Sequence, residues 1–365
     1  MKRILSFCLS LLLLTGILAG CTETTPEQTQ PTQQGPTQQG PTQQEPTQQE
    51  DETLKILMIG GSLGYDTMYV LPAVAQNEGM TDVTFGLMYR SAGLDKLKPY
   101  TVSGKPEFAY FEYVSGEDQV WRQAYSNGNF TYAVPNQTND KYIEDGSMAV
   151  SVEYVLQRMD WDIVIIMSSS QEITNVKGNL NMANAEAIMN YVKEHDADPS
   201  TTPEFGWHMI WSVPEDSTLW NDSRRSFMET YYNGNAMAMY EDNVKNTQQI
   251  VVPALEGKVK YFFPCATALM NAKSSTVVED KDIHRDYIHG TDYGRLIAAY
   301  TWYCVLTGTN IRDCKFGPVP NGIVRDNVIR NSGEDYELSE EWKQVLIESL
   351  ENAIKNPYAL TQSAY

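Results

Sequence analysis

The chain has 365 residues, and its 47 aspartates and glutamates outnumber its 27 lysines and arginines, which gives a formal net charge of −20. Hydrophobic residues make up 42 % of the chain and charged residues 20 %, so the chain is not disordered throughout and can bury a large core. Nucleic acids and anionic membrane surfaces bind basic footprints, and the acidic balance therefore excludes both as main partners.

Residues 1–20 have the features of a bacterial signal peptide. Lys2 and Arg3 precede an apolar run that is too short to span a membrane, and the run is followed by the residues LAGC at 18–21. This ending resembles the lipobox of bacterial lipoproteins. The resemblance implies cleavage before Cys21, a diacylglycerol group on its thiol, and an extracytoplasmic protein that the lipid anchor alone attaches to the bacterial cell membrane. A secretory peptide that is cleaved at small residues is the alternative.

Residues 21–53 have the composition of a tether. The motif PTQQG starts at Pro31 and is repeated three more times, with glutamate in place of glycine in the last two copies. Such repeats favour extended chain and cannot bury a core. We therefore predict a disordered linker between the anchor and one folded domain, residues 54–365. A ligand for a proline-binding module is the alternative.

The folded part alternates apolar runs with helical patterns. Five short runs have the pattern of strands that are buried on both faces: Lys55–Ile59, Val83–Met88, Asp162–Met167, Gly206–Trp211 and Lys258–Phe263. Helical patterns occupy residues 148–159, 182–195, 237–251 and 292–307, and the last has Thr291 as N-cap and Gly308 as its stop. This alternation predicts a three-layer α/β/α fold with a mostly parallel sheet.

Residues 96–146 are rich in tyrosine, glycine and asparagine and interrupt the alternation. Two of their segments, Phe108–Val114 and Phe130–Val134, have the character of a hairpin. We therefore expect an insertion here, and the sequence assigns it no role.

The cysteines and histidines point to no disulfide scaffold and no metal. Cys8 and Cys21 belong to the leader, and Cys265, Cys304 and Cys314 are too few to staple a domain of this size. Pairing of Cys304 with Cys314 stays open. The four histidines show neither an HExxH motif nor the spacing of a structural zinc site, so we expect no metal and no other cofactor.

A serine follows the first predicted strand in the turn Gly60-Gly61-Ser62. Glycines permit a sharp turn from strand to helix, and a serine placed there exposes its hydroxyl beside free backbone N–H donors. Neither a GxGxxG motif nor a P-loop is present, so the turn does not predict a nucleotide site. Taken alone, the motif is weak, and a structural turn is the better interpretation.

A serine nucleophile needs a base and a group that orients the base. Asp286 and His289 stand three residues apart just before the last helix, so one local turn brings the carboxylate to the imidazole. A surface ion pair is the alternative. His195 lies in what looks like a solvated helix end, and His208 alternates along a predicted strand as structural histidines do.

An early Gly-x-Ser turn and a late Asp-x-x-His resemble the SGNH, or GDSL-type, hydrolases. The chain more narrowly resembles a bacterial SGNH-like family catalogued as a domain of unknown function, DUF4886, over roughly Leu54 to Ile311. The stretches that carry this resemblance are IGGS at 59–62, WDIV at 161–164, WHMIW at 207–211, FPCATA at 263–268 with NA at 271–272, and RDYIH at 285–289 with GR at 294–295 and LTG at 306–308.

The resemblance implies a flavodoxin-like α/β/α fold and a Ser–His–Asp esterase, often one that acts on acyl groups of carbohydrates. Ser62 would attack the ester carbonyl, His289 would be the base, and Asp286 would orient the imidazole. The oxyanion hole would use the Ser62 N–H and a glycine after the second strand, Gly93. Other SGNH enzymes add an asparagine after the third strand. Here none falls there, and Gln171 is the nearest amide. Gly61 also stands where many members carry aspartate or asparagine.

The resulting prediction is a surface-anchored serine esterase that removes acyl groups, chiefly acetyl, from carbohydrate. The predicted partner is thus a glycan or small-molecule ester, and no protein partner is assigned. Aromatic side chains are candidates either for a sugar platform or for the core: Trp207, Trp211, Tyr231 and Tyr232. The alternatives are a non-catalytic glycan- or solute-binding lipoprotein on the same fold, and an esterase or thioesterase for other substrates.

Overall fold

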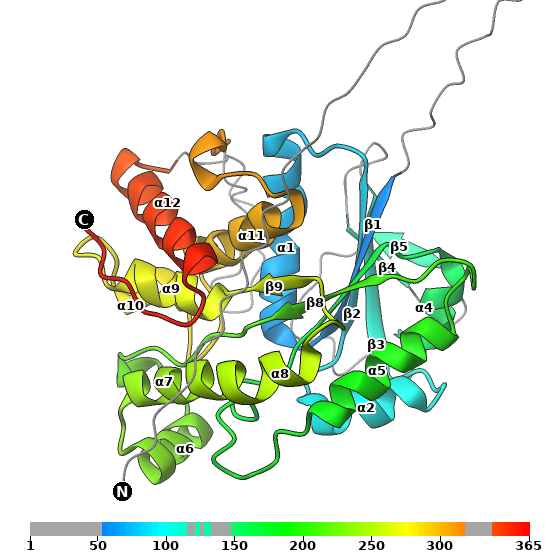
Figure 1. Ribbon diagram of the computed structural model, residues 1–365, viewed down its shortest axis with the longest axis horizontal. Coiled ribbons are helices and arrows are strands. Elements are labelled where there is room, and N and C mark those ends of the chain that lie inside the picture. Colours follow the sequence, from blue (N-terminus) through cyan, green and yellow to red (C-terminus); the bar gives the residue numbers. More distant parts are fainter. Residues whose placement is uncertain (1–52, 115–120, 125–127, 133–145, 147, 318–337) are drawn as a thin grey trace, which may run out of the picture. The chain divides into compact units, whose positions relative to one another are not determined.

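A mixed β-sheet forms the centre of the computed structural model (Figure 1), which describes residues 53–114, 121–124, 128–132, 146, 148–317 and 338–365. Within these residues the sheet has nine strands, and eight of them follow the order β5-β4-β3-β2-β1-β7-β8-β9. The predicted signal segment, Cys21 and most of the predicted linker lie outside the described residues.

One half of the sheet is parallel and matches the five predicted apolar runs. It contains β1 (Leu54–Gly60), β2 (Val83–Tyr89), β7 (Ile163–Ile166), β8 (Glu204–His208) and β9 (Tyr261–Phe263). All neighbouring pairs in this half run parallel, with Ile56 opposite Phe85 on one side and Ile163 on the other. The runs are apolar throughout because helices cover both faces of the sheet.

The other half is antiparallel, and the prediction of a mostly parallel sheet is therefore wrong. It contains β3 (Phe108–Val114), β4 (Trp121–Ala124), β5 (Phe130–Tyr132) and β6 (Ala149–Val150). β3 pairs antiparallel with β2. On its other side β3 pairs with β4, which in turn pairs with β5, and the first two residues of β3, Phe108 and Ala109, pair with β6. The expected hairpin insertion is thus present, and it makes the sheet mixed because it continues the same sheet beyond β2.

Helices cover both faces (Figure 1). One face carries α1 (Ser62–Glu78), α9 (Cys265–Lys273), α11 (Asp292–Thr307) and α12 (Glu340–Lys355), and the other carries α2 (Leu94–Val102), α4 (Val152–Arg158) and α5 (Met182–Glu194). The remaining helices are α6 (Asp222–Tyr232), α7 (Ala236–Asn246), which continues through a π-helical turn (Thr247–Val251) into α8 (Val252–Leu255), and α10 (Asp280–Ile283). Short 3₁₀ turns occupy Ser217–Leu219 and Ile311–Asp313.

Helix α11 follows its prediction residue by residue. The Thr291 hydroxyl accepts the N–H of Gly294 at the start of the helix, and Gly308 ends it in the left-handed conformation with φ +71°. The helix is buried nearly all round, as its apolar sequence predicts. No helix in the described part of the chain has both the length and the hydrophobicity that crossing a bilayer requires.

Two glycines flank the junction of β1 and α1. A Cβ at Gly64, in the first turn of α1, would lie 2.2 Å from Cε of Met58, and one at Gly60, at the end of β1, would lie 2.5 Å from the same atom. Both distances are shorter than real contacts, so a larger residue at either position requires the Met58 side chain to move.

The three cysteines of the described residues, Cys265, Cys304 and Cys314, are all buried and free. Cys304 and Cys314 are thus not paired in this structure.

Candidate active site

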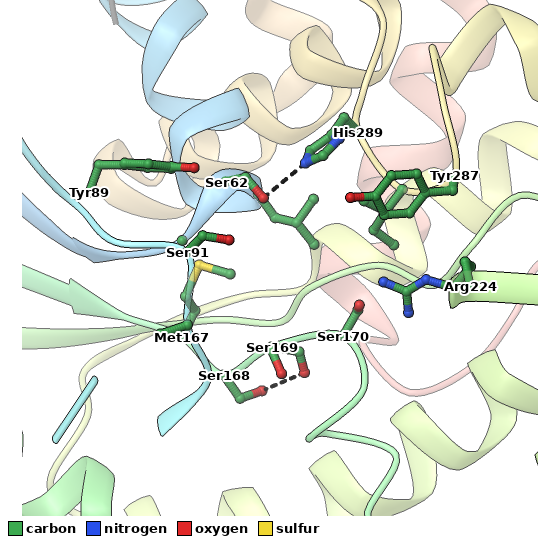
Figure 2. A pocket seen from close by; sticks show the side chains of 14 residues that line it. Ser62, Tyr89, Ser91, Met167, Ser168, Ser169, Ser170, Arg224, Tyr287 and His289 are labelled. Carbon is green, nitrogen blue, oxygen red and sulfur yellow. Dashed lines mark hydrogen bonds between the residues drawn. The ribbon is translucent and has the colours of Figure 1, made fainter. Parts of the chain in front are cut away.

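Ser62, His289 and Asp286 form one chain of hydrogen bonds at the carboxyl edge of the parallel strands. Ser62 Oγ lies 2.9 Å from Nε2 of His289 (Figure 2), and His289 Nδ1 lies 2.9 and 2.8 Å from the two carboxylate oxygens of Asp286. With the proton on Nδ1, the ring donates to Asp286, and Nε2 is left to accept the serine proton. The structure thus joins the three residues that the sequence singled out, which lie up to 227 positions apart.

The local turn that the sequence predicts holds Asp286 in place. Its Oδ1 accepts the backbone N–H groups of Ile288, at 3.0 Å, and of His289, at 2.9 Å. Burial raises the pKa of Asp286, but the hydrogen bonds from the His289 ring and from both backbone groups outweigh it and lower the pKa to about 2. The carboxylate is therefore ionised at neutral pH and fixes the tautomer of the imidazole.

A buried ionic cluster, which we call the Asp66 cluster, attaches the histidine loop to helix α1. Asp66 lies one turn after Ser62, and its Oδ1 accepts from Arg295 at 2.7 and 2.9 Å and from Arg285 at 3.1 Å. Its Oδ2 accepts the backbone N–H of Gly290 at 2.8 Å. Burial alone would raise the pKa of Asp66, but the two arginines hold it below its ordinary value. The cluster therefore sets the position of His289 relative to Ser62.

Two further contacts fix the same loop. Trp211 Nε1 donates to the carbonyl of Ile288 at 2.6 Å. A Cβ at Gly294 would lie 2.2 Å from the carbonyl oxygen of Ile283, so a glycine is required where α11 passes the loop.

A pocket with a volume of about 300 Å³ opens beside the serine and the histidine. The ends of β1, β2 and β7 contribute most of its wall, as expected for ligand sites of open α/β sheets. Its lining, several members of which Figure 2 shows, consists of Gly61, Ser62, Leu63, Tyr89, Ser91, Ala92, Met167, Ser168, Ser169, Ser170, Arg224, Tyr287, Ile288 and His289.

The two predicted oxyanion donors, Gly93 and Gln171, are not in this lining, although their neighbours Ala92 and Ser170 are. Gly93 is the N-cap of α2 and packs against Glu172, whose Oε2 would lie 2.7 Å from a Cβ at that position. Gln171 lies in a turn that exposes Ser168 to Ser170 to the pocket instead. The roles of Gly93 and Gln171 stay predictions, and Ser168, Ser169 and Ser170 are the polar residues that line the pocket after β7.

The other predicted candidates lie in the core or at the surface. Trp207 and Trp211 are 1 % exposed and pack in the core, so neither forms a sugar platform. Tyr232 is buried, whereas Tyr231 is 41 % exposed, and neither lines the pocket. His208 is buried and accepts a hydrogen bond from Trp302 Nε1 at 2.8 Å, and burial lowers its pKa to about 3. It is therefore a neutral structural histidine, as its strand pattern predicted.

His195 ends α5 and stacks on Tyr191. Among the described residues no three His, Cys, Asp or Glu side chains are grouped so that they could hold a metal ion.

Sequence reasoning did not assign a role to four residues around the site: Asp66, Arg224, Arg285 and Arg295. Arg295 carried a usable signal, because a charged residue within an otherwise apolar helix must find a buried partner. Asp66 had a weaker signal, its position one helical turn after Ser62. Arg224 had none, since it lies in a helix of mixed polarity.

Comparison with known proteins gives two results. The family described as "Domain of unknown function (DUF4886)" matches residues 131–335, which include Asp286 and His289 but not Ser62. The chain is also similar to a crystal structure of a DUF4886 family protein from Bacteroides uniformis, with a TM-score of 0.61 and 21 % identity over 85 % of this chain and 98 % of that one. At this identity the likeness shows the fold alone. No curated protein matches the chain.

Proposed function

The chain belongs to the DUF4886 family, a domain of unknown function, and from that premise we propose that it is a serine esterase of the SGNH type that removes short acyl groups, chiefly acetyl, from carbohydrate. The observation that carries the proposal is the hydrogen-bonded chain from Ser62 through His289 to Asp286, with the serine facing an open pocket. A nucleophile, a base and an orienting carboxylate in hydrogen-bond contact are what acyl transfer by serine requires.

In the proposed mechanism Ser62 Oγ attacks the ester carbonyl while His289 Nε2 takes the serine proton. The imidazolium, stabilised by the Asp286 carboxylate, then gives that proton to the leaving alcohol, and an acyl group remains on Ser62. A water molecule, deprotonated by the same imidazole, attacks the acyl-enzyme and releases the carboxylic acid. The pKa of Asp286, at about 2, supports this sequence because the carboxylate is charged whenever the imidazolium forms.

The start of α1 supplies the proposed oxyanion site. Ser62 is the first residue of this helix, so its own N–H has no acceptor within the helix and lies beside its hydroxyl. The positive end of the helix dipole adds to the stabilisation of a developing oxyanion. Backbone N–H groups near Ala92 and the Ser168 hydroxyl, at the neighbouring strand ends, are the candidates for the other donors.

The pocket supports a small, polar ester rather than a lipid. A volume of about 300 Å³ is at the lower end of small-molecule sites, and four of the lining residues are serines besides the nucleophile. Hydroxyls and backbone groups suit a sugar, whereas a lipid esterase needs a deeper apolar tunnel. A binding protein without activity would have no need for the hydrogen bond of 2.9 Å between Ser62 and His289.

We also propose that the esterase is an extracytoplasmic lipoprotein attached through Cys21, on the basis of the LAGC sequence at 18–21. Mass spectrometry of the protein from its host tests this. A diacylated Cys21 at the mature N-terminus is expected, and an unmodified Cys21 or another mature terminus contradicts the proposal.

The direct test of the activity is acetate release from a panel of O-acetylated monosaccharide glycosides. The wild type should release acetate, and Ser62→Ala should not. Ser103→Ala is the matched control, since Ser103 is an exposed serine outside the pocket lining whose hydroxyl donates to the Tyr100 carbonyl. Equal activity of Ser62→Ala and wild type refutes the assignment of the nucleophile, and absence of any ester hydrolysis favours the binding-protein alternative.

A further inference from the structure

One buried cation in the pocket has neither a hydrogen bond nor an ion pair from its side chain to any residue that the structure describes. Arg224, in the first turn of α6, is 8 % exposed and lines the pocket opposite Ser170 (Figure 2). Its Nη1 is buried without a hydrogen-bond partner, and its guanidinium forms no ion pair with any described residue. A buried charge without a partner is costly, and it is usually retained where something else neutralises it.

Arg295 differs from Arg224 in having a carboxylate. It is fully buried and its Nη1 also lacks a hydrogen-bond partner, but its Nη2 and Nε donate to the Asp66 carboxylate at 2.7 and 2.9 Å. The guanidinium of Arg224 instead lies over aromatic faces, with Cζ 5.4 Å from the ring centre of Tyr287 and 5.9 Å from that of Phe227. Aromatic faces stabilise a cation weakly and leave its N–H donors free.

The rest of the pocket admits an anion. No carboxylate is among its lining residues, although the chain has 47 acidic residues and a net charge of −20. The Asp286 carboxylate attracts Arg224 electrostatically, but it lies outside this lining and is already hydrogen-bonded to the His289 ring and to two backbone N–H groups. The guanidinium fork matches the oxygen atoms of carboxylates, phosphates and sulfates.

The position of Arg224 identifies the part of the substrate that it meets. Arg224 lies over Tyr287, and the rings of Tyr287 and His289 meet edge to face with centres 5.6 Å apart. In the proposed mechanism His289 gives its proton to the leaving alcohol, so the alcohol must lie on the His289 side. The carbonyl oxygen lies on the other side, towards the start of α1.

We infer that Arg224 binds an anionic group on the alcohol part of the ester, and that the substrates are acylated alcohols that carry a carboxylate, phosphate or sulfate. This inference rests on the proposed function and narrows its substrate class. For carbohydrates the class comprises acylated uronic acids and acylated sugar phosphates or sulfates, which share the oxyanion that Arg224 binds.

The test compares monoacetates of four methyl glucosides that differ only at C6: the uronate, its neutral uronamide, the 6-phosphate and the parent sugar. For the wild type, kcat/KM should be at least about 10-fold higher for the uronate or the phosphate than for the uronamide. The anion with the higher kcat/KM shows whether Arg224 binds a carboxylate or a phosphate on its substrate. Arg224→Gln should lower kcat/KM for that anion by about 10²-fold and change the uronamide less than about 3-fold. Arg224→Lys should fall between the two.

Arg225→Gln is the matched control. It removes the same charge from the neighbouring residue, whose side chain donates to the Ser217 carbonyl outside the pocket. It should leave the anion preference unchanged. Retained hydrolysis of the uronamide shows that Arg224→Gln is folded. A wild type without anion preference, or an equal loss on all four substrates in Arg224→Gln, overturns the inference and leaves Arg224 a structural residue.

Failure of the proposed function is distinguishable. If the wild type hydrolyses neither these acetates nor 4-nitrophenyl acetate, the esterase assignment fails. The anion site is then judged by calorimetric binding of the unacetylated uronate and uronamide. Binding of the uronate that Arg224→Gln abolishes supports the site, and equal or absent binding of the two overturns it.

Discussion

Two helices begin at neighbouring strand ends, and their N-termini differ in what accepts their backbone N–H groups. Helix α1 follows β1 and helix α2 follows β2, and each starts after an extended glycine, Gly61 or Gly93, that has no side chain to cap it. In α2 the Glu172 carboxylate takes this place, accepting from Leu94 at 2.7 Å and from Asp95 at 3.1 Å. Within the described residues no side chain does the same for α1.

The difference separates a helix end that the protein itself caps from one whose backbone donors stay open. A helix N-terminus has N–H groups without intrahelical acceptors and a partial positive charge, so a carboxylate there is stabilising. In α2 the protein itself provides the anion. In α1 the first residue is the candidate nucleophile, and the open donors remain for the charge that develops on the substrate.

The largest effect is expected from removing Ser62, at the start of α1, or its partner His289. Ser62→Ala and His289→Ala should each lower kcat by about 10⁴-fold or more, and the double variant should be little worse than either single one, because nucleophile and base act as a unit. Steady-state kinetics on an acetyl ester measure this. Multiplicative losses in the double variant would show that the two residues do not act together.

The second effect comes from the Asp66 cluster that positions the histidine loop over α1. Asp66→Asn leaves two buried guanidinium groups without a carboxylate and should lower the free energy of unfolding by about 3–5 kcal/mol. Because the folded-state pKa of Asp66 is depressed, its contribution is present above the unfolded-state pKa and is lost as the pH falls through the folded one. The difference from the wild type should thus be largest near pH 7 and shrink below about pH 4.

Urea unfolding at several pH values measures the Asp66 effect. Asp313→Asn, in the 3₁₀ turn Ile311–Asp313 remote from the site, is the control and should behave as the wild type. A loss in Asp66→Asn that does not depend on pH contradicts the role given to the ionised carboxylate.

The third effect tests the N-terminus of α2, whose backbone N–H groups donate to Glu172. Glu172→Ala leaves the two buried donors of α2 unsatisfied and should cost about 1–3 kcal/mol of unfolding free energy, while kcat falls less than about 10-fold. Burial raises the pKa of Glu172 even though the backbone donors lower it, so its contribution declines as the pH rises through that pKa. The difference in unfolding free energy between wild type and Glu172→Gln should accordingly narrow as the pH rises above the ordinary glutamate pKa of about 4.3. A 10²-fold loss of kcat with unchanged stability would assign Glu172 to catalysis instead.

The smallest effect concerns Gln171. A side chain that supplies an oxyanion donor should cost about 10²–10³-fold in kcat when it is removed. Since Gln171 is absent from the pocket lining, we expect Gln171→Ala to change kcat by less than about 3-fold. A loss near 10²-fold would restore the sequence-based assignment and require the turn to move when substrate binds.

The sequence reveals those parts of the fold and site that depend on local pattern. The buried runs of the parallel strands and the Asp286–His289 turn are local, because neighbouring residues supply both the pattern and the contacts. The antiparallel half of the sheet was assigned less well. β3 lies where the sequence predicted it, but β4, β5 and β6 are short, and the pairing of β3 with β2 is set by tertiary contacts.

The missed parts of the site are long-range. Arg295 meets Asp66 across 229 positions, and no spacing rule links such residues. Gln171 was chosen by counting along the chain from β7, but the turn that follows the strand presents Ser168 to Ser170 instead. One residue of register in a turn decides which side chain faces the pocket.

The most direct test of the central claim is covalent labelling with a fluorophosphonate, which phosphonylates activated serines, followed by peptide mass spectrometry. The account predicts one adduct, on Ser62, that forms at least about 10²-fold more slowly in His289→Ala and at an unchanged rate in Ser103→Ala. An adduct on a different serine, or an unlabelled Ser62 in protein that still hydrolyses esters, would contradict it.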